Sequence, residues 1–388
     1  MQEQILITLL RIAMTGHDED IRYVIDHGKK VDWNSVLTIA QKQNVVCVAF
    51  DGIQKCFSVE NTTKEDIGMT MPMMANWIKI NNSNKDRYNL HEVIFHGLVD
   101  TFEKHGIELL LLKGLGVSKL YPVPSSRTCG DIDIFPRWID GKKLNEQGLK
   151  ACEFIDKFAE NKHISVEHEN PKHSVFVLQN VTIENHASFM DVESIPFERE
   201  IEKTLTDYIN EEGLLSVTDM EYASLTQQEH SACPTMKTLS PNANYIFLLR
   251  HMAKHFRAYQ SLNLRQIMDF GVFLNYYRDE LDIEKIRQNI IEFKHVLIND
   301  LMVTIAEKFT GYDLGFALIE PSKVYPKDQD RIIDDIFHGK HSYSVKQNNS
   351  FLYSIIIMLR QHWKHKYIPD SFLERSLYAV KRVLHIAS

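Results

Sequence analysis

Two aspartates stand one residue apart in the segment Gly130-Asp131-Ile132-Asp133-Ile134. Acidic and aliphatic residues alternate there, so in a β-strand both carboxylates would lie on one face, about 7 Å apart at Cα, while the isoleucines pack on the other. Two such carboxylates repel each other unless a cation or solvent lies between them, and hard divalent cations prefer oxygen ligands. The pair indicates a site for Mg²⁺ or Mn²⁺, although an acidic pair at a solvent-exposed sheet edge fits the same pattern.

A short apolar run and a glycine turn precede the aspartates. Residues 107–113 read IELLLLK, which is typical of a buried strand, and Gly114 opens a turn into a helix. Backbone N–H groups at such a turn can bind an anion, and Lys113 and Arg127 add positive charge. Together these residues predict a site for a nucleotide triphosphate.

Further acidic residues stand on or near later strand-like runs. Strand-like runs occupy residues 163–169, 173–180 and 181–189, and on the last of these Glu184 and His186 share a face. Glu184 could therefore reach the metal with His186 beside it. Asp191 or Glu169 could supply this acid instead.

These elements in this order resemble the polymerase-β-like nucleotidyltransferase superfamily, and most closely a branch of uncharacterised bacterial nucleotidyltransferases. The resemblance covers roughly residues 90–275, and its motifs are Leu111-Leu112-Lys113-Gly114, Leu120-Tyr121-Pro122, Arg127 and Gly130-Asp131-Ile132-Asp133-Ile134. Many superfamily members carry a serine after the glycine of the turn, where this chain has Leu115.

The resemblance implies an activity and roles for the residues. The enzyme would transfer an NMP group from a nucleoside triphosphate, ATP by default, to an acceptor hydroxyl and release pyrophosphate. Metal ligands would be Asp131, Asp133 and Glu184, holding Mg²⁺ or Mn²⁺, and nucleotide ligands would be Lys113, Gly114, Arg127 and Ser118. The acceptor could be a protein, a tRNA or a small molecule. The alternative is a catalytically inactive nucleotidyltransferase fold that serves as a binding or regulatory module, in a toxin-antitoxin pair or a biosynthetic cluster.

Two residue pairs at helical spacing follow the predicted core. His251 and His255 stand four residues apart, as do Arg265 and Asp269. The resemblance makes this segment a wall of the nucleotide cleft, where the four side chains, together with His186, could contact the acceptor. Structural packing, or a separate metal centre of the two histidines with Asp269, remains open.

The expected fold class is α+β, with a small mixed β-sheet core flanked by N-terminal helices and a C-terminal helical domain. The expected segments are an N-terminal helical region (1–90), the nucleotidyltransferase core (91–195), a connecting segment (196–240) and the C-terminal helical domain (241–388). Helices are predicted at 89–106, 140–160, 242–257, 263–277, 283–309, 328–338, 350–366 and 371–386.

The bulk composition fits a globular protein of 388 residues, with 44% hydrophobic residues and a net charge of −8. The negative net charge argues against a protein that binds nucleic acid over a broad surface. Five scattered cysteines, no basic leader and no apolar run of roughly 18 residues predict a cytoplasmic protein without a membrane span. A basic group near the C-terminus could contact tRNA or form a solvated helix face: Arg360, Lys364, Lys366, Arg375, Lys381 and Arg382.

Overall fold

The computed structural model describes residues 1–59, 62–139, 150–192, 196–217, 236–257, 262–320, 324–338 and 362–368. Contacts divide the chain into two compact units. The sheet unit comprises residues 46–51 and 71–244, and the helical unit comprises residues 1–45, 52–70 and 245–388. Each unit is therefore assembled from segments that are far apart in the sequence. The predicted helix at 371–386, most of that at 350–366 and the first part of that at 140–160 lie outside the described residues.

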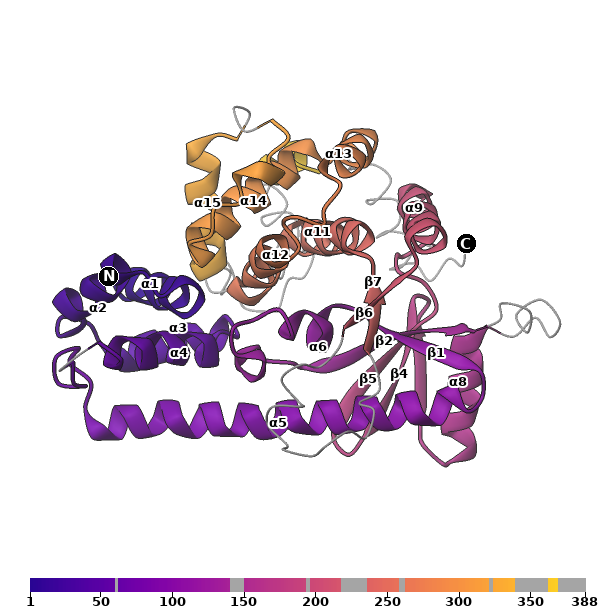
Figure 1. Cartoon of the computed structure of the whole chain (residues 1–388), viewed down its shortest axis with the longest axis horizontal. Coiled ribbons are helices and arrows are strands. Elements are labelled where there is room, and N and C mark those ends of the chain that lie inside the picture. The colour runs from indigo at the N-terminus through magenta and orange to yellow at the C-terminus, as the bar shows by residue number, and fades with distance from the viewer. Residues whose placement is uncertain are drawn as a thin grey trace, which may run out of the picture. The chain divides into compact units, whose positions relative to one another are not determined.

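The sheet unit contains a seven-stranded mixed sheet with the order β3-β4-β5-β2-β1-β7-β6 (Figure 1). Strand β1 is antiparallel to β2 and parallel to β7, and β2 is parallel to β5. The α+β class is thus confirmed. The strands are β1 (Ile107–Leu111), β2 (Asp131–Trp138), β3 (Val166–Asn170), β4 (His173–Leu178), β5 (Val181–His186), β6 (Leu214–Val217) and β7 (Met236–Leu239). Strands β6 and β7 fall in the stretch 196–240, which the sequence analysis described only as a connecting segment.

Two helices cover one face of this sheet. They are α5 (Met71–Glu103) and α8 (Ala151–Asn161), whose apolar side chains pack on alternate residues of the strands. Because neighbouring residues of a strand face opposite sides, Ile132, Ile134 and Ile183 enter this core and are fully buried. The intervening polar residues of β2 and β5 must therefore lie on the opposite face. The remaining helical segments of the sheet unit are α6 (Lys113–Ser118), η1 (Pro124–Ser126) and α9 (Pro196–Glu212).

The helix predicted at 89–106 begins much earlier, because α5 is 33 residues long. The middle of α5 is polar and has no apolar stripe, but its polar side chains form hydrogen bonds with other parts of the sheet unit. Asn84 donates to the carbonyl of Ser125 at 2.6 Å, and Arg87 donates to the carbonyl of Gly130 at 2.9 Å. These bonds fix the loop that leads into β2. Beyond Glu103 a turn ends at Gly106, whose φ of +74° is accessible to glycine at little cost.

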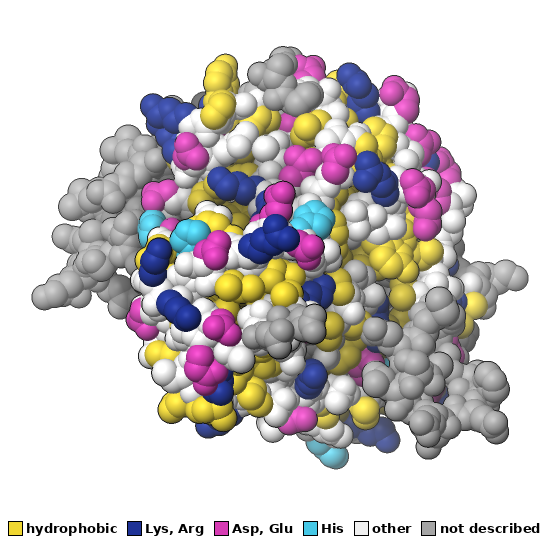
Figure 2. Space-filling model, turned by 60° about the vertical axis from the view of Figure 1, so that its left-hand side comes forward, with side chains coloured by type: hydrophobic (Ala, Val, Ile, Leu, Met, Phe, Trp, Pro, Cys, Tyr) yellow, Lys and Arg dark blue, Asp and Glu magenta, His cyan; other side chains and the backbone are white. Residues whose placement is uncertain are grey.

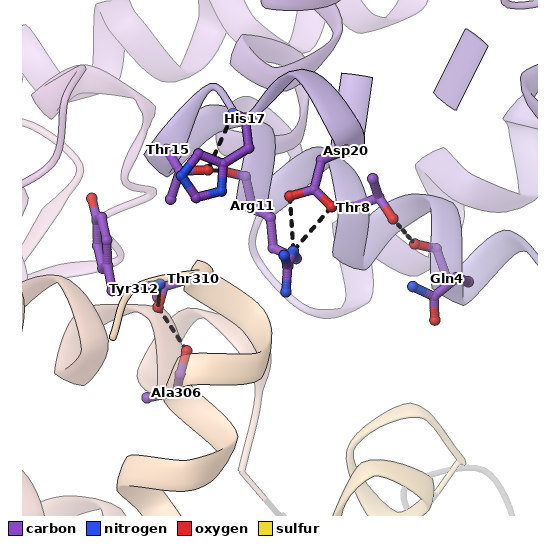
Figure 3. A network of polar contacts seen from close by, with 9 residues as sticks. All are labelled: Gln4, Thr8, Arg11, Thr15, His17, Asp20, Ala306, Thr310 and Tyr312. Carbon is purple, nitrogen blue, oxygen red and sulfur yellow. Dashed lines mark hydrogen bonds and ion pairs between the residues drawn. The ribbon is translucent and has the colours of Figure 1, made fainter. Parts of the chain in front are cut away.

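The helical unit joins N-terminal and C-terminal helices. Its elements are α1 (Gln2–Thr15), α2 (Asp18–Gly28), α3 (Trp33–Lys42), α12 (Leu264–Tyr276), α13 (Ile283–Glu292), α14 (Val296–Thr310), η2 (Gly315–Ala317), α15 (Pro326–His338) and η4 (His362–Lys366), while α4 (Val46–Phe57) and α11 (Pro241–Arg257) contribute residues to both units. Helix α1 packs on α2, α3 and α14. Figure 3 shows Arg11 of α1 paired with Asp20 of α2 at 2.9 Å.

The single helix predicted at 283–309 is wrong, since the chain forms two helices, α13 and α14. The break lies at residues 293–295, where Lys294 adopts a φ of +54°. No glycine or proline marks this break, so the sequence pattern gave no signal for it.

Charged side chains of both signs are interspersed on the face shown in Figure 2. Of the predicted C-terminal basic group, Lys364 is 2% exposed and lies 2.6 Å from Asp335, and Lys366 is paired with Asp328. The other four members lie outside the described residues. Among the described helices, none is both long and apolar enough to cross a bilayer. Four cysteines, Cys47, Cys56, Cys129 and Cys152, are buried free thiols, and Cys233 falls outside the described part.

Candidate active site

Three carboxylates converge on the face of the sheet opposite α5 and α8. Strands β2 and β5 run parallel with Asp133 beside Glu184, and Asp131 lies two residues before Asp133 on the same face. One oxygen from each of the three side chains lies within 4.8 Å of the others. Asp191 and Glu169, the alternatives for the third acid, are not part of this group. We call Asp131, Asp133 and Glu184 the acid triad.

Asp133 is the most deeply buried member of the triad, with 1% of its surface exposed. Its Oδ1 accepts hydrogen bonds from Lys113 Nζ at 2.9 Å and from His186 Nε2 at 3.0 Å. Burial alone would raise the pKa of Asp133, but the Lys113 ammonium and the His186 hydrogen bond outweigh it and hold the pKa well below its usual range. The group is therefore a carboxylate at neutral pH.

The second oxygen of Asp133 bears on whether the triad fits a metal ion. Asp133 Oδ2 is buried and has no hydrogen-bond partner within the part of the chain that the structure describes. A buried carboxylate oxygen is costly to leave unpaired, and a cation beside it would remove that cost. Because Asp131 and Glu184 supply further oxygens close by, the triad fits Mg²⁺ or Mn²⁺.

Lys113 lies among these acids, with its Nζ also 4.0 Å from Glu184 Oε2. Burial would lower the pKa of Lys113, but Asp133, Glu184 and Asp131 raise it above its ordinary value. The side chain is thus a fixed positive charge in the site. Its backbone has a φ of +28°, which is rare for a residue with a Cβ.

Gly114 continues this unusual backbone, with φ +46° and ψ −117°. A Cβ at this position would lie 3.7 Å from Asp133 Oδ2 and 3.9 Å from Arg127 Nη1, so the glycine stands directly beside the acid triad. Arg127 is 5% exposed, and its Nη1 contacts the carbonyl of Thr128 at 3.3 Å. The turn therefore brings Lys113, Gly114 and Arg127 together with the triad.

Ser118 is placed differently from these residues. Its side chain is fully buried, and its hydroxyl donates to the carbonyl of Leu115 at 2.5 Å within α6. The Ser118 hydroxyl thus forms its hydrogen bond within α6.

His186 and one histidine that the sequence analysis missed border the triad. His173 of β4 lies opposite His186 of β5, and its Nε2 is 3.9 Å from Glu184 Oε1. The tight turn at Gln179 and Asn180, both with positive φ, sets this register, so counting back along the hairpin could have found His173. Burial lowers the pKa of His173, only partly offset by Glu184, and favours the neutral imidazole.

Of the residues predicted for the acceptor side, His186 lies on β5 of the sheet unit, whereas the other four belong to the helical unit. The rings of His251 and His255 have centroids 4.6 Å apart, and Asp269 is 7% exposed. Among the described residues, these side chains form no group of three converging metal ligands. A role for them, and for Arg265, in acceptor binding stays a prediction.

Three converging carboxylates and a half-buried lysine beside a strained glycine turn define a site suited to metal-assisted transfer of a phosphoryl or nucleotidyl group. The family model described as uncharacterised nucleotidyltransferase matches residues 29–311, more than half of the chain. The chain therefore belongs to this nucleotidyltransferase family. No curated protein and no solved structure matches it.

Proposed function

We propose that the protein is a Mg²⁺- or Mn²⁺-dependent nucleotidyltransferase that transfers an NMP group from a nucleoside triphosphate to an acceptor hydroxyl and releases pyrophosphate. ATP is the first donor to test. The observation that carries the proposal is the convergence of Asp131, Asp133 and Glu184 within 4.8 Å, together with a buried oxygen of Asp133 that has no hydrogen-bond partner among the described residues.

Each residue of the site has a role in this proposal. When bound, two divalent ions would neutralise the triphosphate and activate the acceptor hydroxyl. The acid triad holds these ions. Lys113 supplies a positive charge for the phosphates, and Gly114 lets them approach the backbone without a side chain in the way. Arg127 stands next to this turn and is the second cationic group for the phosphates.

Ser118 is left out of the proposed phosphate site, because its hydroxyl is buried and bonded within α6. Many superfamily members have a serine after the glycine of the turn, but this chain has Leu115 there. Leu115 has no hydroxyl that could contact a phosphate. Lys113 and the turn would carry more of the phosphate binding.

The alternative, an inactive fold used as a binding or regulatory module, would be favoured if the third acid pointed away from the other two. Glu184 instead points toward Asp131 and Asp133. This arrangement supports the catalytic proposal over the inactive one. The acceptor, whether protein, tRNA or small molecule, is left to experiment.

The test uses the full chain with Mg²⁺ or Mn²⁺ and each α-labelled nucleoside triphosphate, with the protein itself, tRNA and small hydroxyl compounds as acceptors. We expect pyrophosphate release and a labelled acceptor. Asp133→Asn should reduce the rate on the order of 10²–10³-fold, as is typical when one preorganised charge is lost. Glu167→Gln, an exposed acid on β3, is the matched control and should keep the rate. Nucleotide binding without turnover would favour the inactive module, and no binding at all would contradict the proposal.

A further inference from the structure

A second group of metal-ligating side chains lies beside the acid triad on the same face of the sheet. His173 and His186 are directly opposite each other on β4 and β5, and Glu184 stands two residues before His186. One nitrogen of each imidazole and one oxygen of Glu184 lie within 4.8 Å of one another. The two rings have centroids 4.9 Å apart. The register of the β4–β5 hairpin therefore places two imidazoles and a carboxylate close together.

The nitrogens of this group are incompletely paired. Nε2 of His186 is 3.3 Å from Glu184 Oε2, and Nε2 of His173 is 3.9 Å from Glu184 Oε1 and 3.4 Å from Asn170 Nδ2. Nδ1 of both rings is buried and lacks a hydrogen-bond partner among the described residues. His186 is only 1% exposed, so bulk water does not reach its ring. Two imidazoles with unpaired nitrogens beside one carboxylate indicate that a bound ion could supply the missing contacts.

The types of donor atom decide which ligand fits. Two imidazole nitrogens and one carboxylate oxygen are a known set for Zn²⁺ and for Fe²⁺, and imidazole suits divalent transition metals generally. Mg²⁺ takes oxygen ligands and fits the acid triad better. The side chains of His173 and Glu184 remain 15% and 21% exposed, so an ion can enter from solvent.

We propose that His173, Glu184 and His186 form a second metal site that binds a divalent transition-metal ion in preference to Mg²⁺. Glu184 is shared between this site and the acid triad. The site depends on its own three donors and not on nucleotidyl transfer. If His186 binds the ion through Nε2, its hydrogen bond to Asp133 Oδ1, now 3.0 Å long, is lost; if it binds through Nδ1, that bond is kept.

The test is a titration of the chelator-stripped full chain with Co²⁺ and Zn²⁺ in the presence of excess Mg²⁺. We expect one Co²⁺ per chain that Mg²⁺ does not displace. His173→Ala and His186→Ala should each weaken this binding by more than the roughly 10–100-fold typical of an outer-shell change. Two controls should change the Co²⁺ affinity little: Asp131→Asn, which alters the acid triad alone, and His168→Ala, which removes a half-exposed imidazole from β3.

A measurement on the wild-type protein keeps the test valid if the histidine variants fold poorly. The NMR spectrum of the Co²⁺-loaded chain should contain paramagnetically shifted signals from two imidazoles. Co²⁺ binding that survives both histidine substitutions, or a Co²⁺ spectrum without imidazole signals, would overturn the proposal. Nucleotidyl transfer with Mg²⁺ is assayed separately, so failure of this site and failure of the proposed enzyme activity are distinguishable.

Discussion

The ammonium group of Lys113 lies 2.9 Å from Asp133 Oδ1 and 4.0 Å from Glu184 Oε2. A lysine cation thus stands between two carboxylates that we propose as metal ligands. Its charge disfavours a divalent ion beside it, whereas the phosphates of a nucleotide would attract Lys113 away from Asp133. We therefore expect the ion pair to couple metal binding to nucleotide binding.

Lys113→Met tests this coupling. Without the ammonium, Mn²⁺ should bind the nucleotide-free protein more tightly, by roughly tenfold or about 1.4 kcal/mol, because repulsion is removed. Affinity for a non-hydrolysable nucleotide should fall by a similar factor, since a phosphate contact is lost. Mn²⁺ titration followed by EPR and nucleotide calorimetry measure the two effects. Lys162→Met, at the end of α8, serves as control and should change neither affinity; equal or weaker Mn²⁺ binding in Lys113→Met would refute the coupling.

Gly114→Ala tests the strained turn. A Cβ would be held at φ +46° and ψ −117°, where the backbone of an L-residue is strained by about 1–3 kcal/mol, 3.7 Å from Asp133 Oδ2. We expect a loss of stability of that order in urea denaturation and weaker nucleotide binding. Gly130→Ala is the matched control for stability, because a Cβ there meets no atom within 4 Å and φ is not positive. Similar stabilities for the two variants would contradict the role given to the turn.

Gly52 and Gly97 are helical glycines with opposite expected effects. A Cβ on Gly52 of α4 would lie 2.1 Å from the backbone oxygen of Leu9. Gly52→Ala should therefore force α1 and α4 apart and lower the free energy of unfolding by about 1–3 kcal/mol or more. A Cβ on Gly97 of α5 would meet no atom within 4 Å, so Gly97→Ala should stabilise the helix by roughly 0.5–1 kcal/mol. Thermal denaturation compares them. A Gly52→Ala variant as stable as the wild type would show that this close approach of the helices is wrong.

Glu108 should make the stability of the sheet pH-dependent. This buried carboxylate on β1 accepts from Lys237 of β7 at 2.8 Å and from Arg137 of β2. Burial alone would raise the pKa of Glu108, but these two cations lower it below its ordinary value of 4.5. The folded protein therefore resists protonation more than the unfolded chain does, so the stabilisation is fully present above pH 4.5 and is lost as the pH falls through the folded-state pKa.

Glu108→Gln provides the measurement. At neutral pH it should destabilise the protein by about 1 kcal/mol, a modest cost because Arg137 and Lys237 are partly exposed and can be hydrated. The difference from the wild type should shrink toward acidic pH in urea denaturation. A difference that stays constant between neutral pH and pH 3 would contradict the assignment.

The strands that carry the acid triad could be predicted because alternation along a strand is a local property. Residues 131–135 and 181–189 showed acids on one face, and the structure has β2 and β5 there with the acids together. Alternation along a strand could not predict the ion pair between Lys113 and Asp133, nor the position of His173 close to Glu184. They depend on the order and register of strands from separate segments.

The elements that the sequence analysis missed have tertiary causes. Strands β6 and β7 have four residues each, and β7 pairs with β6 and with β1, so little of their pattern is local. The helical region expected at 1–90 and the helix expected at 89–106 are continuous in α5, and bonds from Asn84 and Arg87 to the loop before β2 anchor its polar part. The catalytic roles of the site residues remain predictions for the experiments above.

The discontinuous helical unit also has a consequence for biosynthesis. The apolar side chains of α1 pack on α14, but α1 ends at Thr15 and α14 begins at Val296. At roughly 5–20 residues per second, a ribosome needs on the order of tens of seconds to deliver the partner helix, and the whole sheet unit emerges in between. The sheet unit can therefore fold first, and we expect the apolar face of nascent α1 to stay uncovered by α14 during that interval, when a chaperone could bind it.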